Sequence, residues 1–530
     1  MKRCTVLAFV VLVFMPILLS VASGISNRSF DAALEGYTEK VEKPTFNPTS
    51  FFSGEFQSQY NRYFEESFQP KGVYTKTYAT LQYDLFSKGN RYIGKNRDIF
   101  ENNYINGELC LEGMPNYAVP EQRQAMQDYV DKLVLLQEKL NRINKFLFVC
   151  VTPSKANFDF DNILEKTKHM ASQDRVNAAE CFSELIAQTD VPHMMCRDRR
   201  DSLAYPAFYP TGIHWSRTFE QETNASIIRE LSALSGKKYR SIILGEVVGS
   251  STPFWRDADV FNLLNVWHEP KCTYYEYVEL MDESEEYDRI RLLIQGSSFS
   301  KGFFRSVLGL YPNETILYIN RDISTIENGG REIPFATFDD VDMDRYLDSV
   351  DGIMIETVEN ELSNYSNGFV DYLLEYLDSY VPGSTTSRAV CFDGASDDAW
   401  NLGALRGIYG REVTFAWATR DSLVMLNDPL LKDVGMEIAC AIPSQVFTNS
   451  SDADVLTVTV NGSEVWKNEY TQAWEGVVYL PPEALEHAIT DGENYDIELR
   501  VSKSFVPQEI GENDDTRDLA IRLMYVGRKR

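Results

Sequence analysis

Cysteine is sparse in this chain of 530 residues, which contains eight in all. None of them forms a C-x-x-C pair, the spacing typical of zinc sites, and the few present cannot build a dense disulfide framework. After Cys4 they stand at Cys110, Cys150, Cys181, Cys196, Cys272, Cys391 and Cys440. The sequence therefore predicts no metal site and no cofactor, and it leaves any disulfide pairing open.

Basic residues are outnumbered: 51 Lys and Arg stand against 79 Asp and Glu, giving a formal net charge of −28. A nucleic-acid partner needs cations that displace counterions from its phosphates, so this balance argues against one. Repeats and low-complexity tracts are also missing. With 44% hydrophobic and 12% aromatic residues, the chain is globular and long enough for more than one domain.

Long apolar runs are missing after the first 24 residues. Lys2 and Arg3 precede an apolar run over 6–19, and small residues follow at 20–24. This is the pattern of a secretory signal peptide, so we predict an exported protein, secreted or anchored on the outer face of the cytoplasmic membrane. The run also allows an uncleaved anchor, although Pro16 and its modest length weaken that interpretation. Polar residues 25–50 then predict a tether.

Short apolar runs at 145–151, 291–295 and 351–355 fit strands that are buried on both faces, as in a parallel sheet. Amphipathic helices are expected at about 55–64, at about 120–142 and after Trp215. Because such strands alternate with helices, residues 51–380 predict a doubly wound α/β domain.

The linker-like stretch 381–388 is followed by a β-rich remainder, 389–530. Runs at 413–417, 455–460 and 495–501, with an Asn461-Gly462 hairpin signal, predict an antiparallel, jelly-roll-like β-sandwich. Three tryptophans in this part either stack on sugar rings or fill the core, and both readings stay open: Trp417, Trp466 and Trp474.

Gly296, Ser297 and Ser298 directly follow the run at 291–295. The loop at the carboxyl end of such a strand is where open α/β sheets place ligands and catalytic groups. Ser298 is therefore a candidate nucleophile, and Gly296 and Ser297 are candidates to support it or an oxyanion. A serine-rich turn that caps a helix would give the same pattern.

Histidine is scarce too, with five in the chain, and His214 stands just before an expected helix start at Ser216. A neutral imidazole is the usual general base for a serine hydroxyl, whereas a half-buried structural histidine is the alternative. The other four have no nucleophile context and are assigned structural roles: His169, His193, His268 and His487.

With His214 before Ser298, the chain resembles the alginate O-acetyltransferase-like branch of the SGNH hydrolase superfamily. That branch carries a D-x-H-W element before a G-[DT]-S-[FY] element, the reverse of the usual order. The similarity covers about residues 45–365 and includes the segments 53–57, 94–100, 104–105, 151–155, 259–264 and 355–362. The β-rich remainder resembles the carbohydrate-binding module that follows this domain.

The resemblance implies an SGNH-like O-acetyltransferase that acts outside the cytoplasm on a polysaccharide hydroxyl, with Ser298 as nucleophile and His214 as proton carrier. It also implies a membrane-bound O-acyltransferase as the partner that supplies acyl groups. Two alternatives remain. One is a carbohydrate acetylesterase that uses the same residues, and the other is a polysaccharide-binding protein whose SGNH domain is degenerate.

Two positions depart from the family pattern. Gly212 stands where the family has its Asp, and losing that acid from a triad costs about four orders of magnitude in rate. Thr211, Asp198 and Asp201 lie close in sequence, but nothing ranks them as substitutes. Ser297 stands where many relatives have Asp, which is a milder change.

Overall fold

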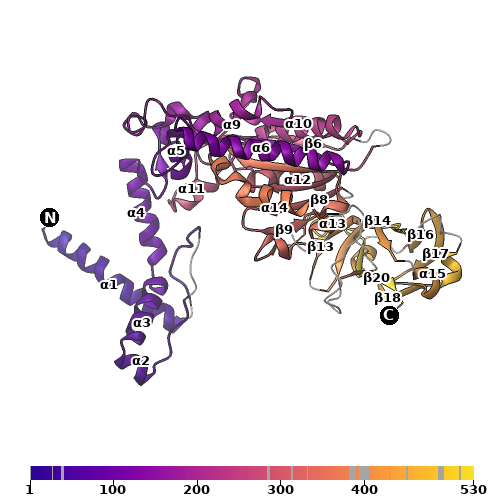
Figure 1. Ribbon diagram of the computed structural model, residues 1–530. Helices are drawn as coiled ribbons and strands as arrows, with labels where there is room; N and C mark the ends of the chain where they lie inside the picture. The colour runs from indigo at the N-terminus through magenta and orange to yellow at the C-terminus, as the bar shows by residue number, and fades with distance from the viewer. Residues whose placement is uncertain are drawn as a thin grey trace.

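The computed structural model describes residues 2–26, 28–36, 41–282, 287–311, 314–330, 332–380, 389–392, 405–412, 414–428, 430–448, 452–486, 494–511 and 515–529. The predicted linker 381–388, Val413 and His487 lie outside them. Along the chain, a helical N-terminal segment leads into an α/β domain and then into a β domain (Figure 1).

Four helices precede the α/β domain: α1 (Lys2–Ser26), α2 (Pro48–Phe52), α3 (Glu55–Ser67) and α4 (Lys71–Phe86). The helix expected at 55–64 is α3, but none of its residues is buried, and Tyr60 and Phe64 are 40% and 45% exposed. In the described part of the chain, no helix is long and apolar enough to cross a membrane.

The α/β domain is built on a seven-stranded sheet of order β10-β9-β8-β7-β11-β3-β4. Its strands are β3 (Phe146–Thr152), β4 (His193–Met195), β7 (Arg291–Gly296), β8 (Thr315–Asn320), β9 (Ser324–Glu327), β10 (Ile333–Pro334) and β11 (Gly352–Val358). The three buried strands expected from sequence are β7, β11 and β3, which lie side by side in parallel.

The sheet is mixed, so the prediction of a wholly parallel sheet was wrong at one edge. Strand β9 pairs antiparallel with β8, and β10 pairs antiparallel with β9. Only three residues separate β8 from β9, and Asn320 closes this turn by accepting hydrogen bonds from the N–H groups of Asp322 and Ser324. So short a link permits only an antiparallel hairpin, since a parallel pair needs a crossover of a dozen or more residues.

Helices cover both faces of this sheet, with α6 on one face and α10 and α12 on the other. The α-helices described in this domain are α5 (Asn102–Leu109), α6 (Pro120–Arg142), α7 (Lys155–Phe158), α8 (Glu165–Lys168), α9 (Ala178–Ile186), α10 (Arg217–Ser235), α11 (Asp259–Leu263), α12 (Lys301–Leu310), α13 (Met343–Ser349) and α14 (Phe369–Tyr376). Two small antiparallel pairs accompany them: β1 (Tyr92–Ile93) with β2 (Ile99–Phe100), and β5 (Ile243–Ser250) with β6 (Tyr274–Leu280).

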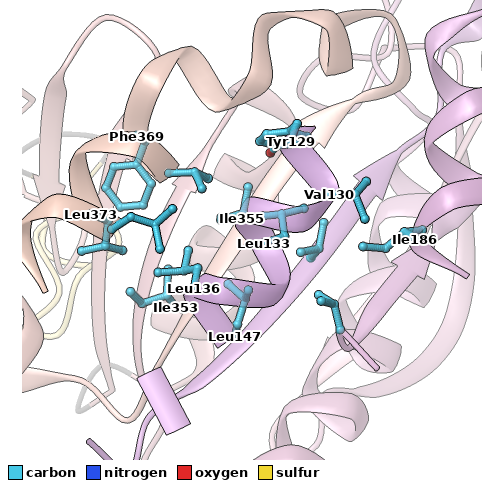
Figure 2. Packing of buried hydrophobic residues seen from close by; sticks show 14 of the residues in the cluster. Tyr129, Val130, Leu133, Leu136, Leu147, Ile186, Ile353, Ile355, Phe369 and Leu373 are labelled. Atoms are coloured by element: carbon cyan, nitrogen blue, oxygen red, sulfur yellow. The ribbon is translucent and has the colours of Figure 1, made fainter. Parts of the chain in front are cut away.

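Alternate residues of the central strands enter two different cores, as the period-two geometry of a strand requires. On one face, Leu133 and Leu136 of α6 pack with Leu147, Ile353 and Ile355 of the sheet (Figure 2). The other face carries Phe148, Leu292 and Met354, packed against α10 and α12. Both faces are therefore closed to water, and the ends of the strands are left for a site.

The β domain is one antiparallel sheet of order β17-β16-β19-β14-β20-β15-β18, with β12 paired to β20 and β13 to β14. Its elements are β12 (Ala389–Cys391), β13 (Leu405–Arg411), β14 (Ala416–Asn427), α15 (Leu431–Val434), β15 (Met436–Ile442), β16 (Asp454–Val460), β17 (Ser463–Tyr470), β18 (Trp474–Leu480), α16 (Pro482–Leu485), β19 (Asn494–Val501) and β20 (Ile521–Arg528). The predicted Asn461-Gly462 turn joins β16 to β17, both residues having positive φ.

The described strands of this domain join one sheet instead of the two stacked sheets of the predicted sandwich. The long strand β14 pairs with β20 over 416–418 and with β19 over 421–427, so it passes from one neighbour to the other. Register shifts in the β13–β14 and β15–β20 pairs bend the sheet around its own apolar core.

Candidate active site

Ser298 lies at the carboxyl end of β7, where it begins a short 3₁₀ turn (Ser298–Ser300) that runs into α12. Gly296 ends the strand, and a Cβ at this position would lie 2.6 Å from Ser300 Oγ. Tyr318 on the next strand donates its hydroxyl hydrogen to the carbonyl oxygens of Gly296 and Ser297, both at 3.0 Å. The turn that carries Ser298 is thus fixed tightly against the sheet.

Glu356, on the neighbouring strand β11, holds the residue before Ser298. The N–H and Oγ of Ser297 both donate to Glu356 Oε2 at 2.7 Å, and Thr152 Oγ1 donates to Oε1 at 2.6 Å. Burial raises the pKa of Glu356, although these hydrogen bonds oppose the rise. Since the Ser297 N–H is directed at this carboxylate, Ser297 supports the turn, and this N–H does not donate to an oxyanion.

His214 reaches Ser298 from the loop before α10. Its Nε2 lies 2.7 Å from Ser298 Oγ, so the structure brings together the two residues singled out from sequence. Ser216 caps α10, as expected, by accepting a hydrogen bond from the Phe219 N–H. The start of the helix thereby fixes the loop that carries the imidazole.

Asp259 holds the other side of the imidazole, with its Oδ2 2.5 Å from His214 Nδ1. Its Oδ1 accepts hydrogen bonds from the N–H groups of Ile213 and Val260, at 3.0 and 2.9 Å. With Nδ1–H donating to this carboxylate, the Nε2 lone pair faces Ser298 Oγ, as a general base requires. Ser298, His214 and Asp259 therefore form a hydrogen-bonded chain from hydroxyl to carboxylate.

Gly212 leaves no room for the acid that the family pattern has at its position. A Cβ there would lie 2.8 Å from the carbonyl oxygen of Asp257 and 3.1 Å from that of Arg256. The main chain of 256–257 thus packs directly on Gly212, and it continues into Asp259. The acid stands 45 residues after His214 in the sequence, not two residues before it.

The substitutes that were left unranked from sequence do not fill this role. Thr211 is buried, and its Oγ1 donates to the Asp257 carbonyl at 2.7 Å, so it ties two loops together. Asp198 and Asp201 belong to a separate 3₁₀ turn (Cys196–Ser202). Asp259 stands at the start of the recognised segment 259–264, but nothing local in the sequence shows that it contacts His214.

Lys155 holds the loop before His214 in place by hydrogen bonds to backbone carbonyl groups. Its buried Nζ donates to the carbonyl oxygens of Ile99, Tyr209 and Gly212, at 2.9, 2.7 and 2.8 Å. It also forms an ion pair with Asp98 at 2.7 Å. This lysine, the first residue of α7, therefore ties three chain segments together, including the loop that carries His214.

Arg256 completes the immediate surroundings of the imidazole. Its Nη1 lies 3.0 Å from His214 Nε2 and 2.8 Å from the Ser298 carbonyl oxygen. Sequence reasoning missed this residue because it belongs to no motif that was singled out. Only the folding of its loop onto Gly212 brings it to the site.

A cavity of about 490 Å³ opens over Ser298 and His214. Its wall is rich in groups that bind hydroxyls, including Glu101, Asn103, Lys301, Tyr318, Asn320, Arg321, Asp322 and Glu361. Ligand sites commonly have this volume, with a few polar groups that fix orientation. The wall suits a small, hydroxylated ligand.

The three candidate sugar-stacking tryptophans have different positions in the β domain. Trp417 and Trp474 are half-buried and line a surface depression of about 460 Å³, together with Gln445 and Arg522. Trp466 stands on β17, packs against the core and does not line that depression. The depression therefore brings together two of the three residues.

The remaining histidines of the described chain bond elsewhere. The Nδ1 atoms of His169 and His193 lie within hydrogen-bond distance of the carbonyl oxygens of Glu165 and Val191. His268 Nε2 lies 3.2 Å from Asp84 Oδ1. These contacts agree with the structural roles predicted for them.

No protein-family model and no curated protein matches the chain. Among solved structures, the O-acetyltransferase domain of Pseudomonas putida AlgJ is 15% identical with a TM-score of 0.36, covering 55% of this chain and 99% of that one. Pseudomonas aeruginosa AlgX is 12% identical with a TM-score of 0.32, covering 84% and 97%. Bacillus cereus PatB1 is 9% identical with a TM-score of 0.29, covering 45% and 91%.

Proposed function

We propose that this protein is an exported O-acetyltransferase that esterifies a polysaccharide hydroxyl through Ser298, His214 and Asp259. The observation that carries the proposal is the hydrogen-bonded chain from Ser298 Oγ through both imidazole nitrogens to Asp259. A serine oriented in this way, at the mouth of a polar cavity, suits acyl transfer.

In the first half-reaction, Ser298 Oγ attacks the acyl carbonyl carbon while His214 Nε2 takes the hydroxyl proton. Asp259 stabilises the imidazolium that forms and keeps the ring in the productive orientation. The leaving group of the donor then departs with the proton from Nε2, and Ser298 holds the acyl group as an ester. In the second half-reaction, the acceptor oxygen attacks the acyl carbon while its hydroxyl proton passes to Nε2. The bond from Ser298 Oγ to that carbon then breaks, Oγ takes the proton back from Nε2, and the acyl group leaves as an ester of the acceptor.

Transfer to a sugar hydroxyl is supported by the order of the motifs along the chain and by the hydroxyl-binding wall of the cavity. The binding-protein alternative rested on Gly212, and the contact of Asp259 with the imidazole supplies an acid that the position of Gly212 lacks. We further propose that a membrane-bound O-acyltransferase delivers the acyl group, and that Trp417 and Trp474 hold the polymer.

The test uses purified protein, a soluble activated acetyl ester, an oligosaccharide acceptor and mass spectrometry. We expect acetylated oligosaccharide with the wild type and none above background with Ser298→Ala. Free acetate alone would instead identify an esterase. No product above the Ser298→Ala background, with sugar binding retained, would identify a binding protein.

A further inference from the structure

We propose that Arg256 is a further catalytic residue, whose guanidinium stabilises the negative charge that forms on the acyl oxygen. The inference rests on the proposed function, since it assigns a role within the same acyl transfer. It starts from the position of Arg256 Nη1, 3.0 Å from His214 Nε2, the atom that takes the serine proton.

Arg256 is a half-buried cation whose direct contacts are not with a carboxylate. Within the described part of the chain, its hydrogen bonds go to His214 Nε2 and to the Ser298 carbonyl oxygen, and its guanidinium lies over the Trp255 ring. Burial lowers the pKa of Arg256, although the charges of Glu220 and Asp259 oppose this. A guanidinium is always charged and only donates, and among the described residues no carboxylate is in direct contact with that of Arg256.

The resting contact with Nε2 cannot persist through the reaction. In the neutral ring, the single lone pair of Nε2 faces two donors, Ser298 Oγ–H and Arg256 Nη1–H. Once Nε2 takes the serine proton, two positive groups face each other and repel. At the same moment the acyl oxygen becomes an oxyanion as its carbon bonds to Ser298 Oγ, and the guanidinium gains an anionic acceptor.

The step balances in atoms and electrons. The Oγ–C bond forms, the π pair of the carbonyl moves onto its oxygen, and the Oγ proton passes to Nε2. Arg256 then donates to the oxyanion. When the pair returns to re-form the carbonyl, the bond from carbon to the leaving group breaks, and that group takes the proton from Nε2. In deacylation the acceptor hydroxyl attacks the acyl carbon, Arg256 again donates to the oxyanion, and Ser298 Oγ is the leaving group that takes the proton from Nε2.

The backbone conformation around Arg256 holds its side chain next to His214 and Ser298. Trp255 has φ +42°, a conformation that bulky residues rarely adopt and that marks local strain. The next residues pack on Gly212, where no side chain fits, and lead into Asp259. One loop thus supplies both the acid and the guanidinium, and the absence of a side chain at Gly212 makes room for it.

The test measures kcat and KM with p-nitrophenyl acetate, a neutral ester that has no carboxylate for an arginine to bind. The variants are Arg256→Ala, Arg256→Met and Arg256→Lys. The matched control is Arg305→Ala, because Arg305 lies over the same Trp255 ring, at 5.2 Å from its centroid. We expect Arg256→Ala and Arg256→Met to lose about 10²- to 10³-fold in kcat with KM little changed, as removal of an oxyanion donor does.

Arg256→Lys should retain more activity than Arg256→Met, and Arg305→Ala should stay near the wild type. Added guanidinium chloride at low concentration should restore part of the Arg256→Ala activity and none of the Ser298→Ala activity. Any of three results would overturn the proposal. The first is a kcat of Arg256→Ala equal to that of the wild type, and the second is an equal loss of activity in Arg256→Lys and Arg256→Met. The third is a loss of activity in Arg256→Ala that guanidinium chloride does not restore. If Arg256→Ala does not fold, the comparison of activity between Arg256→Lys and Arg256→Met tests the proposal instead.

The two proposals fail in different ways. A wild type no faster than Ser298→Ala refutes the proposed function. A wild type that clearly exceeds Ser298→Ala, with Arg256→Ala equally fast, refutes only the role of Arg256.

Discussion

Asp259 Oδ2 lies 2.5 Å from His214 Nδ1, so one hydrogen bond joins a helix start to a loop 45 residues earlier in the chain. We expect Asp259→Asn to reduce kcat by about 10⁴, because an amide no longer selects the imidazole tautomer. Steady-state kinetics with an acetyl ester measures this. Asp201→Asn is the control, since Asp201 is exposed on a separate turn, and equal losses in both variants would contradict the role of Asp259.

Gly212→Asp introduces the acid that the resemblance led us to expect at this position, and it should nevertheless reduce both stability and the proposed activity. The new side chain meets the Asp257 carbonyl, 2.8 Å from its Cβ, so we expect a loss of about 1–3 kcal/mol of stability and a displaced loop. Thermal unfolding and activity report the two effects. Gly309→Ala is the matched control, because a Cβ there meets nothing within 4 Å, and it should be neutral or stabilising. A stable, active Gly212→Asp would show that the loop has another way to pack.

Glu108 on α5 should make the fold less stable as pH rises. Burial and the nearby Glu359 raise the pKa of Glu108 from 4.5 to about 8, so the folded chain holds a proton that the unfolded chain releases. The free energy of unfolding therefore falls with increasing pH between these values, by an amount on the order of a few kcal/mol.

Denaturant unfolding at about pH 5 and about pH 8 checks this, with Glu108→Gln expected to weaken the dependence. The exposed Glu55→Gln is the control and should leave the slope as in the wild type. An unchanged slope in Glu108→Gln would place the titration elsewhere.

Leu136 and Leu135 form a matched pair on α6. Leu136 is fully buried in the core of Figure 2, whereas Leu135 is 42% exposed. Leu136→Ala should cost about 2–5 kcal/mol, and Leu135→Ala much less. Urea unfolding measures both, and equal costs would mean that α6 packs through another face.

Trp417→Ala and Trp474→Ala should weaken binding of the polysaccharide by the β domain while leaving activity on a small ester unchanged. Both rings line the same depression, and stacking on a sugar needs an accessible aromatic face. Affinity electrophoresis in a polysaccharide gel gives the comparison. Trp466→Ala, outside that depression, should retain binding, so loss in all three variants would point to misfolding instead.

The central elements were predictable because their signals are local. A buried strand is an apolar run, and α6 shows helical spacing, so β3, β7 and α6 lie within one residue of their expected bounds, and β11 runs three residues past its expected end. The antiparallel edge was missed because β9 is only four residues long, too short for a clear pattern. The single β sheet was missed because the pairing of strands that are far apart in the chain produces no recognisable pattern in the sequence of either strand.

Ser298 and His214 were found because each stands in a short motif, and their order along the chain is informative. Asp259 was visible in the sequence, but its contact with the imidazole depends on how 254–258 folds onto Gly212. Arg256 had no signal at all. Residue spacing therefore predicts only part of a site that is assembled by the close packing of loops.

If the proposed function holds, Glu356 makes the activity depend on correct assembly of the sheet. It joins Thr152, 204 positions away, to the turn at Ser297, 59 positions away. A slip of one residue between β11 and either neighbour would turn this carboxylate to the opposite face and release the nucleophile's turn. A refolded sample could thus regain all its helices and strands by spectroscopy and still be inactive. The esterase assay would then measure the fraction of chains whose three central strands pair in the native alignment.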